Sequence, residues 1–192
     1  MAARPEGKEL LQLRPPGAQR RTTILHEALR VAAVATLLLL LVFLLRGGGE
    51  PLPQGRPAPL TQGLTLDGGA FDLRTWQGQY VFVNVWATWC APCLQELPDL
   101  AAASKRWPQV RFVGLAADSK RADVDVVTSR LGLPYPVLLI DGALQHAWNA
   151  SALPSSFLVA PDGTIAWSGV GALDARSLDE VLRKSQSATT RP

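Results

Sequence analysis

The sequence predicts an α/β domain built on a mixed β-sheet and preceded by one apolar helix near the N-terminus. Residues 31–45 contain no charged side chain, which is typical of a segment in an apolar environment. After residue 59, short apolar runs typical of strands alternate with helical patterns, and a turn sequence separates the last two strands. Strand–helix alternation followed by a late hairpin indicates a sheet with both parallel and antiparallel strands.

The apolar segment is predicted to be a transmembrane anchor over residues 28–45. As a helix it would span about 27 Å, close to the roughly 30 Å of a hydrocarbon core, provided that Arg30 extends toward the membrane surface. A cleaved signal peptide and a buried globular helix are the alternatives. The long segment before the apolar run and the Arg-Gly-Gly-Gly sequence after it disfavour cleavage.

Charge and composition predict the orientation and the domain boundaries. The formal net charge of +3 comes from residues 1–30, which hold six basic and three acidic side chains. The positive-inside rule then places residues 1–27, a basic tail, in the cytoplasm and the chain beyond the inner-membrane anchor in the periplasm. Residues 46–59 are predicted to be a flexible linker, 60–186 the folded domain and 187–192 a disordered tail. No basic stripe with interleaved aromatics is found, which argues against nucleic-acid binding.

Strand and helix patterns follow one another through the domain. The β-branched and aromatic run at 80–86 fits a central strand that is buried on both faces. Asp-Gly and Pro-Asp-Gly sequences mark the turns of two hairpins. The expected elements are, in order, a hairpin of 64–66 with 70–73, strand 80–86, helix 91–107 interrupted by Pro98, strand 110–115, helix 124–131, strand 136–140, helix 143–148, a hairpin of 156–160 with 164–167, and helix 177–184.

The two cysteines, Cys90 and Cys93, lie just after the central strand and at the start of the following helix. A helix N-terminus offers unpaired N–H groups and a partial positive charge, which favour a thiolate. The spacing lets the second sulfur attack a mixed disulfide formed at the first, so the pair can exchange electrons with another protein. Cys90 is expected to be the exposed attacking sulfur and Cys93 the shielded resolving one, with Pro92 favouring helix entry.

Other uses of a cysteine pair fit less well. A zinc site would need two more ligands, and the exported part offers His146 and carboxylates. Covalent haem attachment requires a His directly after the second Cys, which is missing. A Cu(I)-binding module and a non-redox structural pair stay open as alternatives, although no Met-rich or His-rich patch accompanies the cysteines. We therefore expect no metal and no cofactor other than the redox-active disulfide.

The residues around the cysteines resemble a known family. The run 83–93, Val-Asn-Val-Trp-Ala-Thr-Trp-Cys-Ala-Pro-Cys, is followed by Glu96 and Pro98. Together with the later run 153–159, Leu-Pro-Ser-Ser-Phe-Leu-Val, it is similar to the TlpA/ResA-like branch of thioredoxin-fold proteins. The resemblance covers residues 58–186. It implies a thioredoxin-like fold, with a central mixed sheet flanked by helices and an N-terminal β-hairpin, and the activity of a thiol–disulfide oxidoreductase.

The resemblance also implies roles for single residues. Pro154, preceded by Leu153, matches the family's cis-proline, which lies beside the cysteine pair and shapes the groove for the partner polypeptide. Glu96 matches an acidic residue near the active site that could relay protons or tune the cysteines, with a solvated helix residue as the alternative. Asn84 occupies the position where thioredoxin has a buried acid, which removes one proton acceptor from beneath Cys93.

Further matches and departures concern the immediate surroundings of the pair. Trp89 is expected to cover the sulfurs, and Ala91 and Pro92 form the dipeptide between them. The branch often has Thr after the cis-proline, where Ser155 and Ser156 stand here. The Gly-Ala-Pro-Glu-type loop of dedicated cytochrome c maturation members is absent, which counts against that narrow assignment.

The predicted function is that of an exported, membrane-anchored reductase. It would reduce disulfides of envelope proteins, be re-reduced by a membrane electron-donor protein and contact the lipid bilayer through residues 28–45. The Ala-Pro dipeptide does not fix the reduction potential, and about 30 mV corresponds to 1.4 kcal/mol, so an oxidase or isomerase stays an alternative. A thiol peroxidase would need a lone peroxidatic cysteine in its own loop, which is missing.

Overall fold

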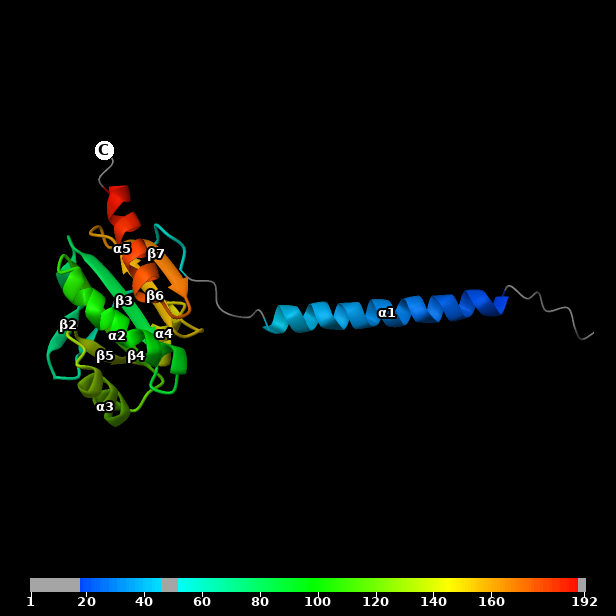
Figure 1. Ribbon diagram of the computed structural model, residues 1–192, viewed down its shortest axis with the longest axis horizontal. Coiled ribbons are helices and arrows are strands. Elements are labelled where there is room, and N and C mark those ends of the chain that lie inside the picture. Colours follow the sequence, from blue (N-terminus) through cyan, green and yellow to red (C-terminus); the bar gives the residue numbers. More distant parts are fainter. Residues whose placement is uncertain (1–17, 46–51, 190–192) are drawn as a thin grey trace, which may run out of the picture. The chain divides into compact units, whose positions relative to one another are not determined.

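The structure, a computed structural model, describes residues 18–45 and 52–189, and Figure 1 shows its elements. The chain divides into two compact units, Met1–Gly47 and Gly48–Pro192. Parts of three predicted segments lie outside the described residues: the basic tail up to residue 17, the linker at 46–51 and the C-terminal tail at 190–192.

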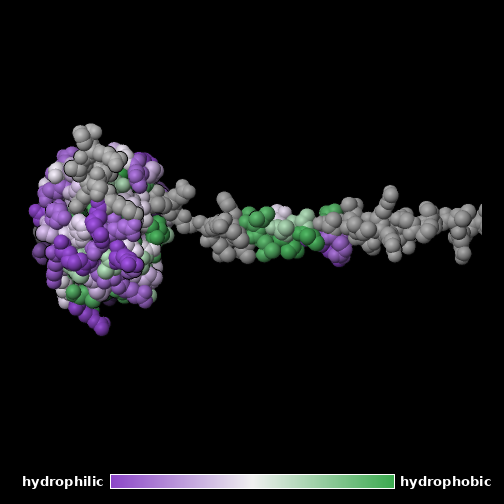
Figure 2. Space-filling view, turned by 45° about the horizontal axis from the view of Figure 1, so that its top comes forward, coloured by the Kyte–Doolittle hydropathy of each residue, from purple (hydrophilic) through white to green (hydrophobic). Residues whose placement is uncertain are grey.

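The described part of the first unit is helix α1 (Ala18–Leu45), which begins before the predicted anchor does. Exposed leucines and valines between Leu29 and Leu40 form an apolar stretch of helix surface, drawn green in Figure 2. Among the residues whose side chains are described, no helix combines the length and the apolarity needed to cross a bilayer. The anchor over residues 28–45 therefore stays a prediction.

The second unit is built around a five-stranded sheet with the strand order β5-β4-β3-β6-β7. The central strand β3 (Tyr80–Trp86) pairs in parallel with β4 (Val110–Ala117) and antiparallel with β6 (Ser155–Val159). β4 also pairs in parallel with β5 (Val137–Ile140), and β6 forms a hairpin with β7 (Ile165–Val170). The apolar, β-branched sequence of β3 suits this position, because both faces of a central strand are buried. The predicted mixed α/β sheet is confirmed.

Helices cover both faces of this sheet. They are α2 (Ala91–Arg106), α3 (Arg121–Leu131), α4 (Gly142–Ala147) and α5 (Ala175–Thr189). Apolar residues of α2, α3 and α5 pack on one face, against Phe82 and Trp86 of β3, and α5 contacts α2 (Figure 1). The short α4 packs on the opposite face through Leu144. The side chains of β3 alternate between the two faces, so Asn84 lies on the α2 face between the two aromatics.

Two helices, α2 and α5, differ from the prediction. α2 runs without interruption through Pro98, where the sequence predicts a break. The buried residues Leu97 and Leu100 hold this part of α2 against the sheet, which offsets the hydrogen bond that a proline cannot donate. The C-terminal tail predicted as disordered from residue 187 is helical as far as Thr189.

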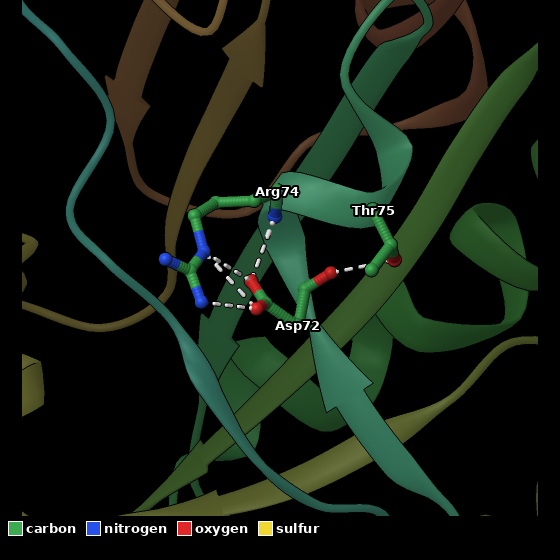
Figure 3. A network of polar contacts seen from close by, with 3 residues as sticks. All are labelled: Asp72, Arg74 and Thr75. Atoms are coloured by element: carbon green, nitrogen blue, oxygen red, sulfur yellow. Dashed lines mark hydrogen bonds and ion pairs between the residues drawn. The ribbon is translucent and has the colours of Figure 1, made fainter.

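A two-stranded hairpin of β1 (Gln62–Leu64) and β2 (Ala70–Asp72) precedes the sheet and leads into a 3-10 turn, η1 (Leu73–Trp76). The hairpin is predicted, but its first strand lies two residues earlier than the predicted 64–66. Figure 3 shows how Asp72 begins this turn. Its carboxylate accepts hydrogen bonds from the Arg74 backbone N–H at 2.9 Å and from the guanidinium at 2.6 Å, and Thr75 Oγ1 donates to the Asp72 carbonyl at 2.7 Å. The Arg74 side chain holds the pKa of Asp72 below its usual value. These contacts turn the chain from the hairpin toward β3.

Residues 52–59 are part of the folded domain, whereas the sequence predicts them to be flexible linker. Leu52 is buried in the core on the α4 face. The Gly55 N–H donates to the Ile165 carbonyl at 2.9 Å, and the Ile165 N–H donates to the Arg56 carbonyl at 2.8 Å. The segment therefore runs along β7. Its Gly and Pro content gives no sign of this, because its partners lie far away in the sequence.

Candidate active site

The two predicted cysteines form a disulfide at the start of α2. Cys90 is the N-cap residue, and its Sγ accepts a hydrogen bond from the Cys93 backbone N–H at 3.3 Å. Pro92 lies in the first turn, where a missing N–H costs no helix hydrogen bond. The Cys90 sulfur therefore lies where the unpaired N–H groups of the helix point.

The two sulfurs differ less in accessibility than the sequence predicts. Cys90 is 6% exposed and Cys93 is fully buried, whereas Ala91 and Pro92 between them are exposed. The order agrees with the prediction, but Cys90 is not an open thiol, because it belongs to the core cluster on the α2 face. A partner can reach the pair only through a small area at Cys90.

Trp89 and Thr88 fix the loop between β3 and α2. The Trp89 indole N–H donates to the Asp118 carbonyl at 2.9 Å, and the Thr88 N–H donates to Ser119 Oγ at 3.0 Å. Both residues are thereby tied to the loop that follows β4. The Trp89 side chain is 63% exposed, so a partner can contact it beside Cys90. That Trp89 covers the sulfurs stays a prediction.

The peptide bond between Leu153 and Pro154 is cis, in agreement with the resemblance. β6 begins directly after it, and Ser155 pairs with Val85 near the end of β3. The register therefore brings Pro154 to the end of β3 at which the cysteine loop starts. The Pro154 carbonyl accepts a hydrogen bond from the Gly171 N–H at 2.8 Å, which ties this loop to the segment after β7.

A buried carboxyl group lies one turn beyond Cys93. Glu96 is 2% exposed, and its Oε1 accepts from Asn84 Nδ2 at 2.7 Å while its Oε2 accepts from the Leu173 N–H at 2.9 Å. Asn84 Nδ2 also donates to Ser156 Oγ at 3.1 Å. Residues three apart share a face of a helix, so this polar group of Asn84, Glu96 and Ser156 lies on the side of α2 that carries Cys93.

Burial raises the pKa of Glu96 to about 7, and the hydrogen bonds from Leu173 and Asn84 oppose this shift. The carboxyl group can therefore gain or lose a proton near neutral pH. Its burial excludes the alternative that Glu96 is a solvated helix residue. Tyr135, in the loop before β5, is a second buried titratable group, and burial together with the negative charge of Glu96 raises the pKa of its hydroxyl.

The sequence marks Ser156 only as a departure from the Thr that often follows the cis-proline, and it gives no signal for Leu173 or Tyr135. Strand alternation could have found Ser156, because it pairs with Asn84 and faces the same side of the sheet. Leu173 acts through its backbone N–H, which leaves no side-chain signal, and Tyr135 depends on how a loop packs. In the part of the chain that the structure describes, no group of three or more His, Cys, Asp or Glu side chains could hold a metal ion.

The chain matches proteins of one family. The Redoxin family matches residues 49–182. The thiol-disulfide oxidoreductase ResA of Bacillus thuringiensis is 29% identical over 138 residues, which cover 70% of this chain and 80% of ResA. The thiol:disulfide interchange protein DsbE of Xylella fastidiosa is 31% identical over 166 residues, which cover 79% of this chain and 81% of DsbE.

The fold is shared with solved structures. A crystal structure of a thiol:disulfide interchange protein of the thioredoxin family from Chlorobium tepidum TLS superposes with a TM-score of 0.64 at 28% identity, covering 71% of this chain and 99% of that one. The mixed α/β domain is therefore thioredoxin-like, and the chain is a thiol–disulfide oxidoreductase with a Cys90/Cys93 pair. The chain belongs to the Redoxin family, within its TlpA/ResA-like branch.

Proposed function

We propose that this chain is a membrane-anchored, extracytoplasmic reductase of protein disulfides. The observation that carries the proposal is the position of Cys90 Sγ at the N-terminus of α2, with the buried Glu96 carboxyl on the same side of the helix as Cys93. This arrangement supplies an attacking sulfur, a resolving sulfur and a group that takes up protons within two turns of one helix.

The reaction is two thiol–disulfide exchanges. The Cys90 thiolate attacks one sulfur of a client disulfide, and the other client sulfur leaves as a thiolate. Cys93 loses its proton and attacks Cys90 Sγ of the mixed disulfide, so that the first client sulfur leaves as well. The client has gained two electrons and, with two protons, holds two thiols, while Cys90 and Cys93 are joined. A membrane electron-donor protein restores the dithiol by the same exchanges in reverse.

The surrounding residues each have a task in this scheme. The unpaired N–H groups of α2 stabilise the Cys90 thiolate in the reduced protein. Glu96 accepts the proton of Cys93, because a carboxyl group with a pKa of about 7 changes its protonation under neutral conditions. The exposed Trp89 and the cis-proline loop at Pro154 form the surface that a client polypeptide contacts.

Residues 28–45 anchor the chain, and the folded domain, which includes residues 52–59, lies in the periplasm. The support is a continuous helix of 28 residues, the absence of charge at 31–45 and the excess of basic residues before that segment. A C-terminal fusion to a reporter that works only after export tests this topology. Export-dependent activity is expected, and activity of a cytoplasm-only reporter at the same position would overturn it.

Cysteine variants of the full-length chain test the mechanism. Both Cys90→Ser and Cys93→Ser should abolish the reduction of insulin disulfides, whereas Cys93→Ser alone should accumulate mixed disulfides with client proteins. The two variants control each other, because each keeps one sulfur. Mixed disulfides on Cys90→Ser but not on Cys93→Ser would mean that Cys93 attacks and Cys90 resolves. Full insulin reduction by Cys90→Ser would refute the mechanism.

The reduction potential decides the direction of electron flow. A value near that of thioredoxin, about −270 mV, supports a reductase, and one near that of a strong oxidant, about −120 mV, supports an oxidase. The proteins trapped by Cys93→Ser identify the clients. Apocytochromes c among them would assign the chain to cytochrome c maturation, and their absence would restrict it to other envelope proteins.

A further inference from the structure

The turn that leads from β3 to Cys90 is tied to the loop that follows β4. The Cys90 N–H donates to the Ala87 carbonyl at 3.1 Å, which closes a four-residue turn. Thr88 and Trp89, the two central residues of this turn, both donate hydrogen bonds to the loop after β4. One of the two acceptors is a side chain, the Ser119 hydroxyl, so this contact depends on the residue type at position 119.

The Ser119 hydroxyl uses its full hydrogen-bonding capacity in this contact. It accepts from the Thr88 N–H at 3.0 Å and from Thr88 Oγ1 at 3.3 Å, and it donates to the Ala117 carbonyl at 2.9 Å. A serine hydroxyl has one hydrogen to donate and two lone pairs. Ala117 is the last residue of β4 and pairs with Ile140 on β5, so it has a fixed place in the sheet. Ser119 therefore joins the turn to the sheet through one side chain.

The backbone between Ala117 and Ser119 has an unusual conformation. Asp118 has a φ of 42°, in the left-handed region that few residues other than glycine adopt. Asp tolerates this conformation because its short side chain can form local hydrogen bonds. The Asp118 carbonyl and the Ser119 hydroxyl both reach the same turn from this bend. Such backbone conformations occur often at functional sites, where they fix the direction of particular groups.

We propose that Ser119 is a positioning residue of the reaction: its hydroxyl holds the turn so that the Cys90 sulfur stays at the N-terminus of α2. Cys90 Sγ accepts from the Cys93 N–H at 3.3 Å there, and the field of a helix N-terminus falls off within its first turn. A sulfur that moves away loses the hydrogen bond and the field, so its thiolate becomes less stable. This inference deepens the proposed function and rests on Cys90 as the attacking sulfur.

Replacement of Ser119 by Ala isolates this effect, because it removes the hydroxyl and changes no charge. The charged side chains that flank Ser119 are those of Asp118 and Lys120, which are both exposed, and α2 contributes the buried carboxyl of Glu96. These groups and the second thiol all remain in the variant. A change in the pKa of the Cys90 thiol would therefore report a change in the position of its sulfur.

The first test measures the Cys90 thiol in the reduced, full-length chain through the pH dependence of its alkylation by iodoacetamide. Mass spectrometry of the alkylated peptide assigns the reaction to Cys90. In Ser119→Ala the midpoint should rise by about 0.5 pH units, a roughly threefold loss of thiolate stability. A midpoint that is unmoved or lower in the folded variant would overturn the positioning role.

The second test is the equilibrium of the cysteine pair with glutathione, at a pH above both alkylation midpoints. A less stable thiolate disfavours the reduced form, so the ratio of disulfide to dithiol in Ser119→Ala should rise about threefold. This change corresponds to a reduction potential that is lower by about 14 mV, since a tenfold change is about 30 mV. A potential equal to that of the wild type would contradict the inference.

Two variants serve as controls. Ser119→Thr keeps the hydroxyl and should restore the wild-type midpoint and potential. Ser104→Ala also removes a partly buried serine hydroxyl, which donates to the Ala101 carbonyl at 2.9 Å near the C-terminal end of α2, and should leave both values unchanged. An equal shift in Ser104→Ala would mean that general destabilisation causes the effect, and the role of Ser119 would be refuted.

A second variant keeps the inference testable if Ser119→Ala does not fold. Thr88→Val removes only the 3.3 Å hydrogen bond to Ser119 Oγ and should raise the alkylation midpoint by a smaller amount, so an unmoved midpoint there would overturn the inference. Neither measurement needs a client protein. Unmoved values in the Ser119 variant would leave the proposed function intact, whereas a wild-type potential typical of an oxidase would remove the reductase assignment and leave the role of Ser119.

Discussion

Replacing Glu96 by Gln should change how the stability of the domain depends on pH. The Glu96 carboxyl has a pKa of about 7 in the folded protein, compared with its ordinary value of 4.5. Between these two pH values the folded state keeps a proton that the unfolded state has released, so the free energy of unfolding falls as the pH rises. A difference of about 2.5 pH units corresponds to about 3 kcal/mol.

The sign of this effect is opposite to that of a carboxylate in an ion pair. The stabilisation that results from the raised pKa of Glu96 is fully present below about pH 4.5. It decreases as the pH rises from 4.5 to 7 and is lost above about pH 7. Glu96→Gln cannot titrate, so the stability of the wild type relative to the variant should fall by about 3 kcal/mol between pH 4 and pH 8.

Urea unfolding of the full-length chain in detergent, followed by tryptophan fluorescence at several pH values, measures this difference. Asp123→Asn, which changes an exposed carboxylate on α3, is the matched control and should run parallel to the wild type. Parallel curves for Glu96→Gln and the wild type would refute the reasoning, because they would mean that folding does not change the proton affinity of Glu96.

Three further substitutions have defined outcomes. Asn84→Asp places a second carboxyl group next to Glu96 Oε1. The infrared C=O bands of the two coupled carboxyl groups should titrate in two steps, with the upper midpoint above about pH 7. A single step with the wild-type midpoint would contradict this. Thr61→Val leaves the buried Trp148 indole N–H, which donates to Thr61 Oγ1 at 3.0 Å, without a partner. It should lower the free energy of urea unfolding by about 1–3 kcal/mol, and an unchanged midpoint would speak against the bond. Gly171→Ala places an L residue at a φ of 99° and should lower the free energy of unfolding by about 1–3 kcal/mol in the same assay, and an unchanged free energy would contradict the prediction.

The strands, the helices and the location of the cysteines could be predicted from local sequence. The run at 80–86 is almost wholly apolar and β-branched, which few structures other than a central strand accommodate. Two cysteines that lie between such a strand and the start of a helix indicate thiol–disulfide exchange. These features depend on neighbouring residues and on periodicity, which the sequence displays directly.

The errors concern contacts between distant parts of the chain. The Gly and Pro content of residues 52–59 predicts a flexible linker, yet the backbone of β7 forms hydrogen bonds with Gly55 and Arg56. The small exposed area of Cys90 depends on how the core packs around the start of α2. None of these partners can be identified from local patterns, since each is set by tertiary packing.

The placement of residues 52–59 along β7 has a consequence for solubility. A sheet edge with unpaired N–H and C=O groups can recruit a strand from another chain, which leads to aggregation. The segment before the hairpin covers the β7 edge through Gly55 and Arg56, and the hairpin covers part of the opposite edge, where Thr65 bridges to Leu138 on β5. The β7 edge and part of the β5 edge are thereby shielded against pairing with a strand of another chain.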